Sequence, residues 1–370
     1  MIQPEVLIIG LGGVGSWALE LLVRSAGISY LVGADFNQER GRRTVFNVAC
    51  GAVLQEHYAR LEFTPIDLNN IEATAETLHR LQPRLILNCA TLQTWWVRKQ
   101  LAPQIADRLG EAGAGPWLPT HLALSRKLML AIRASGWQGP VINSGIADIS
   151  NAVLAKRGLA PTIGLGNIDL VIPALKMAVG QRLDAPARSV GIYAVFHHYH
   201  TGHFRQQPGG APPYFLRLTV DDQDVTAQFD TDQLLHQVSQ ARFSGEALNP
   251  VVAASGVKNA LAMLHDSGLL THSPGPLGLP GGYPVRLSAA GAQVVLPAGL
   301  TMAEALAINQ AGQQADGVER IDDDGRVIFT PKAVQVIREV LDYDLAPLEF
   351  DACDERAAEI IARFKALANP

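Results

Sequence analysis

A glycine-rich turn near the start of the chain has the residue types to bind the phosphates of a nucleotide. Gly10, Gly12 and Gly15 form the pattern G-x-G-x-x-G within "VLIIGLGGVGSWALELL", between a short aliphatic run and a stretch with helical periodicity. In such a turn the first glycine permits a tight bend, the second leaves room for a pyrophosphate, and the third lets the helix pack closely on the strand. The N–H groups and the positive dipole end at the start of the helix favour the phosphates.

An acidic residue follows at the distance expected for a dinucleotide site. Asp35 lies 20 residues after Gly15, at the end of the second predicted strand, where a carboxylate accepts hydrogen bonds from an adenine-ribose diol. A carboxylate there repels a 2′-phosphate, so we predict NAD rather than NADP, although Arg40, Arg42 and Arg43 follow closely and could reverse that preference. The residues expected to contact the cofactor are Gly10, Gly12, Gly13, Val14, Gly15, Asp35, Cys89 and Ala90.

A carboxylate and a histidine in the second half could form an acid/base pair. Asp169 lies in the apolar run "NIDLVI", which predicts partial burial, and a buried carboxylate needs a partner. His198, 29 residues later at the predicted end of a strand, could be that partner. Such a pair fixes the imidazole tautomer and raises its basicity, which suits the proton transfer that accompanies hydride removal from a carbinol. Alternatively, Asp169 caps its own helix together with Asn167, and the histidines line a solvated loop.

Metal binding is the third possibility for the histidine-rich segment "FHHYHTGHF". His197, His198, His200 and His203 are close in sequence, and neutral imidazoles are good zinc ligands. No cysteine or carboxylate accompanies them at close spacing, so we predict no metal site.

Alternating strands and helices must position these groups. Apolar runs and helical periodicity predict strands at residues 6–9, 30–34, 63–66, 85–87 and 140–143, and helices at 16–26, 71–81 and 121–135. Strands that alternate with helices form a parallel sheet covered on both faces. We therefore predict an α/β protein with a Rossmann-type doubly wound parallel sheet.

The second half has a different pattern, typical of a separate α+β substrate domain. Its predicted strands and hairpins lie at residues 189–196, 214–220 and 285–296, and its predicted helices at 167–183, 249–266, 302–313, 331–340 and 351–367. We expect a dinucleotide-binding domain over residues 1–145, a substrate and catalytic domain over 146–350, and a C-terminal helix over 351–370.

Composition excludes several classes of protein. Hydrophobic residues make up 48% of the 370 residues, which allows a sizeable core. The net charge of −5 argues against a nucleic-acid partner, and no apolar run is long enough for a membrane span. Three widely spaced cysteines and a strand pattern that starts by Glu5, which leaves no room for a signal peptide, lead us to expect a cytoplasmic protein.

The N-terminal part resembles two nucleotide-binding families. The glycine turn and "IDLNNIEATAETLHRLQPRLILNCA" are similar to the NAD(P) domain of the saccharopine dehydrogenases. The turn is also similar to that of the ThiF-type and ubiquitin-activating adenylating enzymes. That second family implies a further aspartate, where this chain has Asn37, and an Asn-x-x-Arg-Gln stretch, which "TVFNVAC" lacks.

The second half resembles the lactate and malate dehydrogenases, in the segment that runs from "VINSGIADISNAV" through "IGLGNIDLVIP" to "AVFHHYH". The resemblance implies that Asn143 is a catalytic-pocket residue, that Asp169 is the helix-start aspartate and that His198 is the catalytic histidine. The substrate-clamping arginine of that family falls on Ile172, so we expect a substrate other than lactate or malate. Arg98 is a candidate for the mobile-loop arginine.

Together these patterns predict an NAD-dependent oxidoreductase that transfers a hydride between nicotinamide and a secondary alcohol or ketone, or an amine or imine. His198, Asp169 and Asn143 are the predicted catalytic residues. The alternatives are an ATP-dependent adenylating enzyme and a non-catalytic NAD-binding protein. The expected partner is a small-molecule substrate, with no nucleic acid or membrane, and related dehydrogenases lead us to expect a homo-oligomer.

Overall fold

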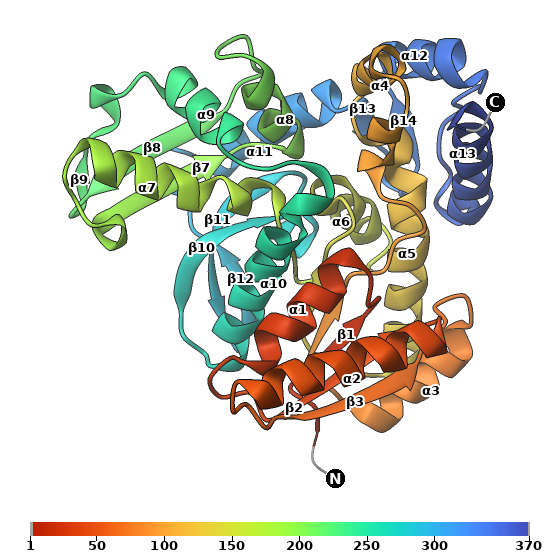
Figure 1. Ribbon diagram of the computed structural model, residues 1–370. Coiled ribbons are helices and arrows are strands. Elements are labelled where there is room, and N and C mark those ends of the chain that lie inside the picture. Colours follow the sequence, from red (N-terminus) through yellow and green to blue (C-terminus); the bar gives the residue numbers. More distant parts are fainter. Residues whose placement is uncertain (1–2, 369–370) are drawn as a thin grey trace.

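A six-stranded parallel sheet is the largest sheet among the described residues, and its strands β1, β2 and β3 lie in the lower part of Figure 1. The computed structural model describes residues 3–368. In chain order the strands are β1 (Val6–Ile9), β2 (Tyr30–Asp35), β3 (Arg60–Pro65), β4 (Leu85–Asn88), β5 (Val141–Asn143) and β6 (Ile163–Gly164). Their spatial order is β3-β2-β1-β4-β5-β6, so the direction of winding reverses between β1 and β4. Ligands of open parallel sheets bind at the carboxyl ends of the strands beside such a reversal.

Side chains alternate across the sheet and bury it on both faces. Val6 and Ile8 of β1 face one core, whereas Leu7 and Ile9 face the other. The first core is closed by α1 (Gly13–Val23), α2 (Gln38–Leu54) and α10 (Asn249–Leu264). The second core is closed by α3 (Ile71–Leu81), α5 (Leu118–Ser135) and α13 (Cys353–Ala368). The predicted doubly wound sheet is therefore confirmed.

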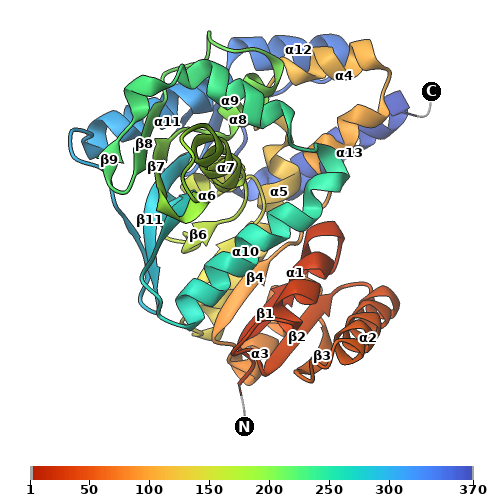
Figure 2. The ribbon, with the colours of Figure 1, turned by 60° about the vertical axis from the view of Figure 1, so that its left-hand side comes forward.

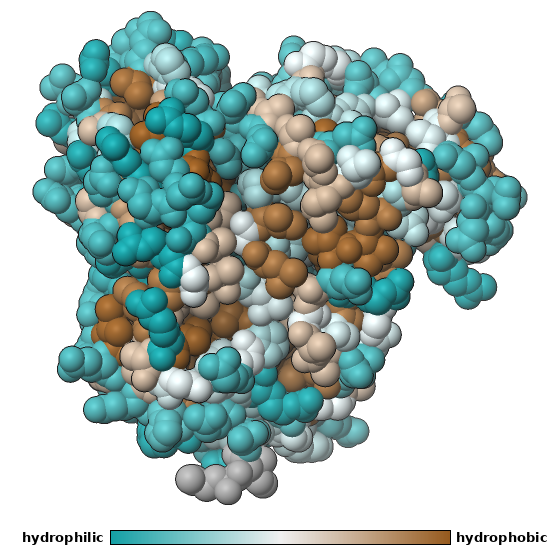
Figure 3. Space-filling model, turned by 180° about the vertical axis from the view of Figure 1, so that it is seen from behind, coloured by the Kyte–Doolittle hydropathy of each residue, from teal (hydrophilic) through white to brown (hydrophobic). Residues whose placement is uncertain are grey.

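Antiparallel sheets and further helices make up the rest of the molecule (Figure 2). The strands are β7 (Val190–Val195), β8 (Phe215–Val220), β9 (Gln223–Asp224), β10 (Leu269–Pro274), β11 (Gly282–Ser288), β12 (Gly291–Val294), β13 (Val318–Ile321) and β14 (Val327–Phe329). The helices are α4 (Pro103–Gly110), α6 (Ala147–Ala155), α7 (Ile172–Arg182), α8 (His198–Gln206), α9 (Thr231–Gln240), α11 (Met302–Ala315) and α12 (Pro331–Leu341). Seen from behind, the surface carries apolar patches between hydrophilic regions (Figure 3).

Residues beyond 145 contribute to the parallel sheet and its cover. The sixth strand, β6, pairs with β5, while α10 packs on α1 and α13 packs on α5. The chain therefore passes more than once between the parallel sheet and the antiparallel part. The domain boundaries at 145 and 350 stay a prediction.

His198 does not lie at the end of a strand, as the sequence pattern had predicted, but at the start of a helix. β7 ends at Val195, and His198 is the first residue of α8. The helix predicted over residues 167–183 is divided in two, because the short 3-10 helix η3 (Asn167–Leu170) precedes α7, and Pro173 lies in the first turn of α7. None of the helices in the described part of the chain is long and apolar enough to cross a membrane.

Candidate active site

The glycine turn has the geometry that a pyrophosphate requires. Gly10 has φ +90°, and a Cβ there would lie 2.7 Å from the amide nitrogen of Ala90, at the end of β4. A Cβ on Gly15 would lie 1.9 Å from the Gly10 carbonyl oxygen, so the helix approaches the strand closely. A Cβ on Gly12 would meet nothing within 4 Å, and no side chain caps the start of α1. The turn therefore offers open space at Gly12 and uncapped N–H groups, which fit a phosphate-bearing cofactor.

Asp35 is buried and its carboxylate is already hydrogen-bonded. Its two oxygens accept hydrogen bonds from the amides of Leu11 and Asn37, each at 2.9 Å. Arg40 Nη2 donates to both oxygens, also at 2.9 Å, and the Arg40 side chain is 50% exposed. A ribose diol can therefore reach the Asp35 carboxylate by displacing Arg40, which has solvent beside it.

Cys89 and Ala90 follow β4 directly and hold the turn in place. The Cys89 amide donates to the Ile9 carbonyl at 2.8 Å, and the Ala90 amide donates to Asn88 Oδ1 at 3.2 Å. Burial raises the pKa of the Cys89 thiol to about 12, so the thiol is not a nucleophile at neutral pH.

The expected pairing of Asp169 with His198 is wrong. Asp169 accepts hydrogen bonds from Ser255 Oγ at 2.5 Å and from Lys258 Nζ at 2.6 Å, both on α10. Thr271 of β10 completes the surroundings of this carboxylate. Asp169 therefore balances a lysine 89 residues away and ties η3 to α10. Neither the predicted dyad nor the predicted self-capping with Asn167 describes it.

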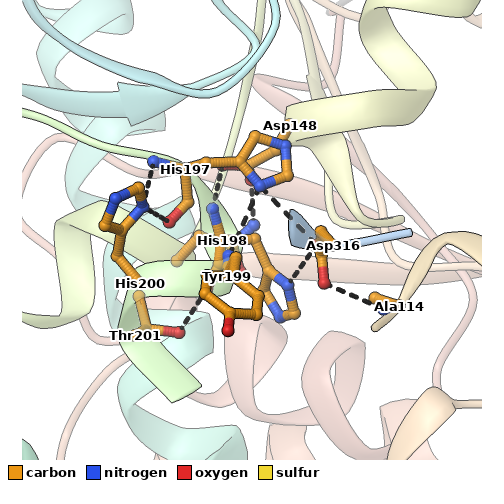
Figure 4. A network of polar contacts seen from close by, with 9 residues as sticks. Ala114, Asp148, His197, His198, Tyr199, His200, Thr201 and Asp316 are labelled. Carbon is orange, nitrogen blue, oxygen red and sulfur yellow. Dashed lines mark hydrogen bonds and ion pairs between the residues drawn. The ribbon is translucent and has the colours of Figure 1, made fainter. Parts of the chain in front are cut away.

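His198 pairs instead with Asp316, which lies directly after α11 (Figure 4). The distance between His198 Nδ1 and Asp316 Oδ2 is 2.9 Å. Asp148 of α6 accepts a hydrogen bond from the His198 backbone N–H at 2.8 Å, so a carboxylate lies at the start of α8. Asn167 in turn donates to Asp148, which fixes that carboxylate.

The charges of this pair stabilise each other. Burial lowers the pKa of His198, but the charge and hydrogen bond of Asp316 and the charge of Asp148 outweigh it, so the pKa of His198 lies above its usual value. Burial likewise disfavours ionised Asp316, but His198 outweighs it and lowers the pKa of that carboxyl. The Ala114 amide donates to Asp316 Oδ1 at 2.8 Å and supports the ionised form. The ionised carboxylate can only accept, so His198 Nδ1 carries the hydrogen of this bond.

Asn143 is not available as a substrate ligand. Its side-chain oxygen accepts from Asn88 Nδ2 at 2.9 Å and from Ser125 Oγ at 3.1 Å. Its side-chain nitrogen donates to Asn151 Oδ1 at 2.9 Å and to Ser150 Oγ at 3.3 Å. Since all four positions of the amide are used and the residue is 1% exposed, Asn143 holds together the carboxyl ends of β4 and β5.

The other histidines of α8 bind backbone carbonyls. His200 Nε2 lies 3.1 Å from the Pro212 oxygen, and His203 Nε2 lies 2.8 Å from the Gly209 oxygen, so both hold the segment that leads into β8. Burial lowers the pKa of His197, whose Nδ1 accepts from the Tyr199 amide at 3.3 Å. Within residues 3–368 no group of three potential ligands is placed to hold a metal ion.

His121 belongs to the site although the sequence did not single it out. This α5 residue is buried, and its Nδ1 lies 3.3 Å from Thr91 Oγ1. Burial, followed by the charge of His198, lowers the pKa of His121 to about 3, so it is neutral at pH 7. Its Nε2 atom is buried without a hydrogen-bond partner. No motif or periodicity in "LPTHLALSRK" distinguishes this histidine from any other on a helix.

Arg98 is a cation whose charge reaches His198, and Ile172 is part of the core. Arg98 lies on the 3-10 helix η1 (Trp95–Gln100) and donates to the Ala106 carbonyl at 3.1 Å. Its charge acts on His198. Ile172 is buried in the apolar cluster of the antiparallel part, so no arginine from this helix clamps a carboxylate beside His198.

This fold is that of the lactate and malate dehydrogenases, as the comparisons with solved structures show. A lactate dehydrogenase from Eimeria maxima, solved with NADH and oxamate, superposes with a TM-score of 0.59 at 14% identity, over 84% of this chain and 91% of its own. A lactate dehydrogenase from a deep-sea metagenome library of the Medee basin has a TM-score of 0.58 at 14% identity, over 85% of this chain and 97% of its own. The malate dehydrogenase of Aeropyrum pernix has a TM-score of 0.57 at 15% identity, over 84% and 97%. No family model and no curated protein sequence matches the chain.

The resemblance of the second half to these dehydrogenases is thus confirmed at the level of the fold. The likeness of the first half to the saccharopine dehydrogenases stays a prediction.

Proposed function

We propose that the protein is an NAD-dependent oxidoreductase that transfers a hydride between nicotinamide and a secondary alcohol or ketone, or an amine or imine. The observation that supports this most is the His198–Asp316 pair, since it provides a buried proton donor and acceptor within a dehydrogenase fold. Bound NAD would supply the hydride acceptor, and the residues of this chain would move the proton.

His198 is the acid/base group in this proposal. Because Nδ1–H is donated to Asp316, Nε2 is the nitrogen that takes the proton from a carbinol or returns it to a carbonyl. Asp316 stabilises the imidazolium that results, and Asp148 fixes the start of α8 through the His198 amide. Asp316 is thus a positioning residue, and it replaces Asp169 in the role that the sequence pattern had assigned.

The described residues at the glycine turn fit the cofactor. The space beside Gly12 and the uncapped start of α1 would hold the pyrophosphate, and Asp35 would hold the adenine ribose once Arg40 moves away.

Two measurements test this function. Quenching of nicotinamide fluorescence on titration with NADH, compared with binding of ATP, separates a dehydrogenase from an adenylating enzyme; binding of ATP alone would overturn the proposal. His198→Gln should then abolish turnover while the NADH affinity stays unchanged. A fully active His198→Gln variant would remove His198 from the mechanism.

We also propose that the chain forms a homo-oligomer in the cytoplasm. α2 presents the side chains of Phe46, Val53 and Leu54 to solvent, with exposed fractions of 68%, 52% and 86%. Positions 46, 53 and 54 share one face of a helix, and apolar side chains grouped on an exposed face are typical of interaction sites. Light scattering after size exclusion should give at least a dimer mass, and Phe46→Ser with Leu54→Ser should reduce it to that of the monomer.

A further inference from the structure

Three cationic side chains from separate segments gather beside the candidate active site. Arg205 at the end of α8 donates through Nη2 to the carbonyl oxygens of Arg242 and Phe243, the second at 2.5 Å. Lys99 of η1 donates to Ser244 Oγ at 2.9 Å. The segment after α9, which contains Arg242, is therefore bonded to Arg205 at the end of α8 and to Lys99 of η1. We refer to Lys99, Arg205 and Arg242 as the basic cluster.

The basic cluster has no counter-charge among the described residues. Other cations of the described residues do have carboxylate partners, as Arg108 has Glu111 at 2.8 Å and Arg40 has Asp35 at 2.9 Å. Over residues 3–368, Lys99 and Arg205 bond only neutral oxygens, and no hydrogen bond or ion pair of the Arg242 guanidinium is found. Arg242 Nε is buried without an acceptor.

Burial and the charge of Arg205 act in the same direction on the other two members of the basic cluster. Burial, followed by the charge of Arg205, lowers the pKa of Arg242 to about 10. Burial and then the charges of Arg205 and Arg98 lower the pKa of Lys99. Like charges held together with an unsatisfied buried donor destabilise a protein unless an anion joins them.

The backbone of Arg205 lies about two turns of α8 beyond that of His198. Arg205 follows His198 by seven residues on α8, which is about 10 Å along the helix axis. Arg98, which precedes Lys99 on η1, lies within electrostatic reach of both the basic cluster and His198, since its charge acts on Lys99 and on His198.

We propose that the basic cluster binds a phosphate group of the substrate, about 10 Å from the carbon that reacts at His198. This inference rests on the proposed function, because it takes His198 as the reacting end. A dianionic phosphate gains about twice the Coulomb energy of a carboxylate at three cations. A 2-oxo acid does not fit, since its carboxylate is bonded directly to the reacting carbon, and the buried Ile172 provides no clamp there.

The test uses methyl phosphate as the probe and sodium acetate as the monoanionic comparison, both at constant ionic strength. Calorimetric titration of the full-length parent should show saturable binding of methyl phosphate and much weaker binding of acetate. Arg242→Met and Lys99→Gln should each lower the affinity for methyl phosphate by about tenfold, the usual effect of losing one charged hydrogen bond. Arg43→Gln is the matched control, because Arg43 is exposed and paired with Glu39, and it should bind methyl phosphate as the parent does.

Thermal unfolding gives a second test, because Arg242→Met should bind phosphate less tightly without losing thermal stability. Without an anion, Arg242→Met should unfold at the same or a higher temperature than the parent, because it removes an unpaired, partly buried cation. Methyl phosphate should raise the unfolding midpoint of the parent but not that of Arg242→Met. A lower midpoint of anion-free Arg242→Met, equal binding of acetate and methyl phosphate, or unchanged binding by both variants would each overturn the proposal.

Failure of this inference can be told apart from failure of the proposed function. NADH binding is measured on the same preparations by fluorescence, and the variants of the basic cluster should retain it. NADH binding without phosphate binding overturns only the phosphate site. Phosphate binding without NADH binding overturns the dehydrogenase and with it the assignment of the phosphate to a dehydrogenase substrate.

Discussion

His198 Nδ1 lies 2.9 Å from Asp316 Oδ2, although 118 residues separate them in the chain. The contact joins the start of α8 to the end of α11, and the Ala114 amide fixes the second oxygen of the carboxylate. The imidazole therefore has one defined orientation, with Nε2 directed away from Asp316.

The pH dependence of activity should follow from this pair. Because the pKa of His198 is raised, its protonated form persists above the usual pKa of about 6.5, and ketone reduction should decline only at a higher pH. Asp316→Asn keeps an acceptor for the Ala114 amide but removes the negative charge beside His198. Burial then lowers the pKa of His198, and the midpoint of the kcat/KM profile should move to lower pH. An Asp316→Asn profile with the parental midpoint would contradict the pairing as the cause.

Asp169 and Lys258 should matter for stability and not for proton transfer. Lys258→Met leaves the buried Asp169 carboxylate without its cation, and the Lys258 side chain is 34% exposed. We expect the free energy of unfolding to fall by about 3 kcal/mol, the lower end for breaking a buried pair. Urea unfolding measures this loss, and the pH profile of the folded variant should coincide with that of the parent. A shifted profile would return Asp169 to the mechanism.

Arg40 should compete with the cofactor for Asp35. Arg40→Ala removes the competing guanidinium from the Asp35 carboxylate, which keeps its hydrogen bonds from the Leu11 and Asn37 amides. NADH affinity should therefore rise by about two- to fivefold, the worth of a half-exposed ion pair. Asp35→Ala should lower the affinity for NADH and shift the selectivity towards NADPH relative to the parent. Fluorescence titration with both cofactors checks this, with Arg43→Ala as the control because Arg43 pairs with Glu39. Unchanged selectivity in Asp35→Ala would mean that the ribose does not lie there.

Two glycines of the turn should respond differently to the same substitution. Gly12→Ala places its Cβ in open space, so stability should stay unchanged while NADH affinity falls by about tenfold. Gly15→Ala forces a Cβ to within 1.9 Å of the Gly10 oxygen, so the free energy of unfolding should fall by about 1–3 kcal/mol. Thermal unfolding and NADH titration of both variants separate the effects. Parental NADH affinity in Gly12→Ala would contradict a cofactor role for the space at Gly12.

Local patterns in the sequence predicted several elements of the half that forms the parallel sheet. The aliphatic run of β1, the glycines at positions 10, 12 and 15, and the helix Ile71–Leu81 depend on neighbours within a few residues, and the structure has them as predicted. The amphipathic period of a helix and the turn preferences of glycine act over such short distances, so sequence alone reveals them.

Only the tertiary structure decided which charged groups meet. Asp169 has a histidine 29 residues away but binds Lys258, and His198 binds Asp316, because η3 packs on α10 and α8 packs on α11. A buried charge requires some partner, yet nothing in the spacing of residues says which. The basic cluster of Lys99, Arg205 and Arg242 arises in the same way, from three segments that meet only in the folded chain.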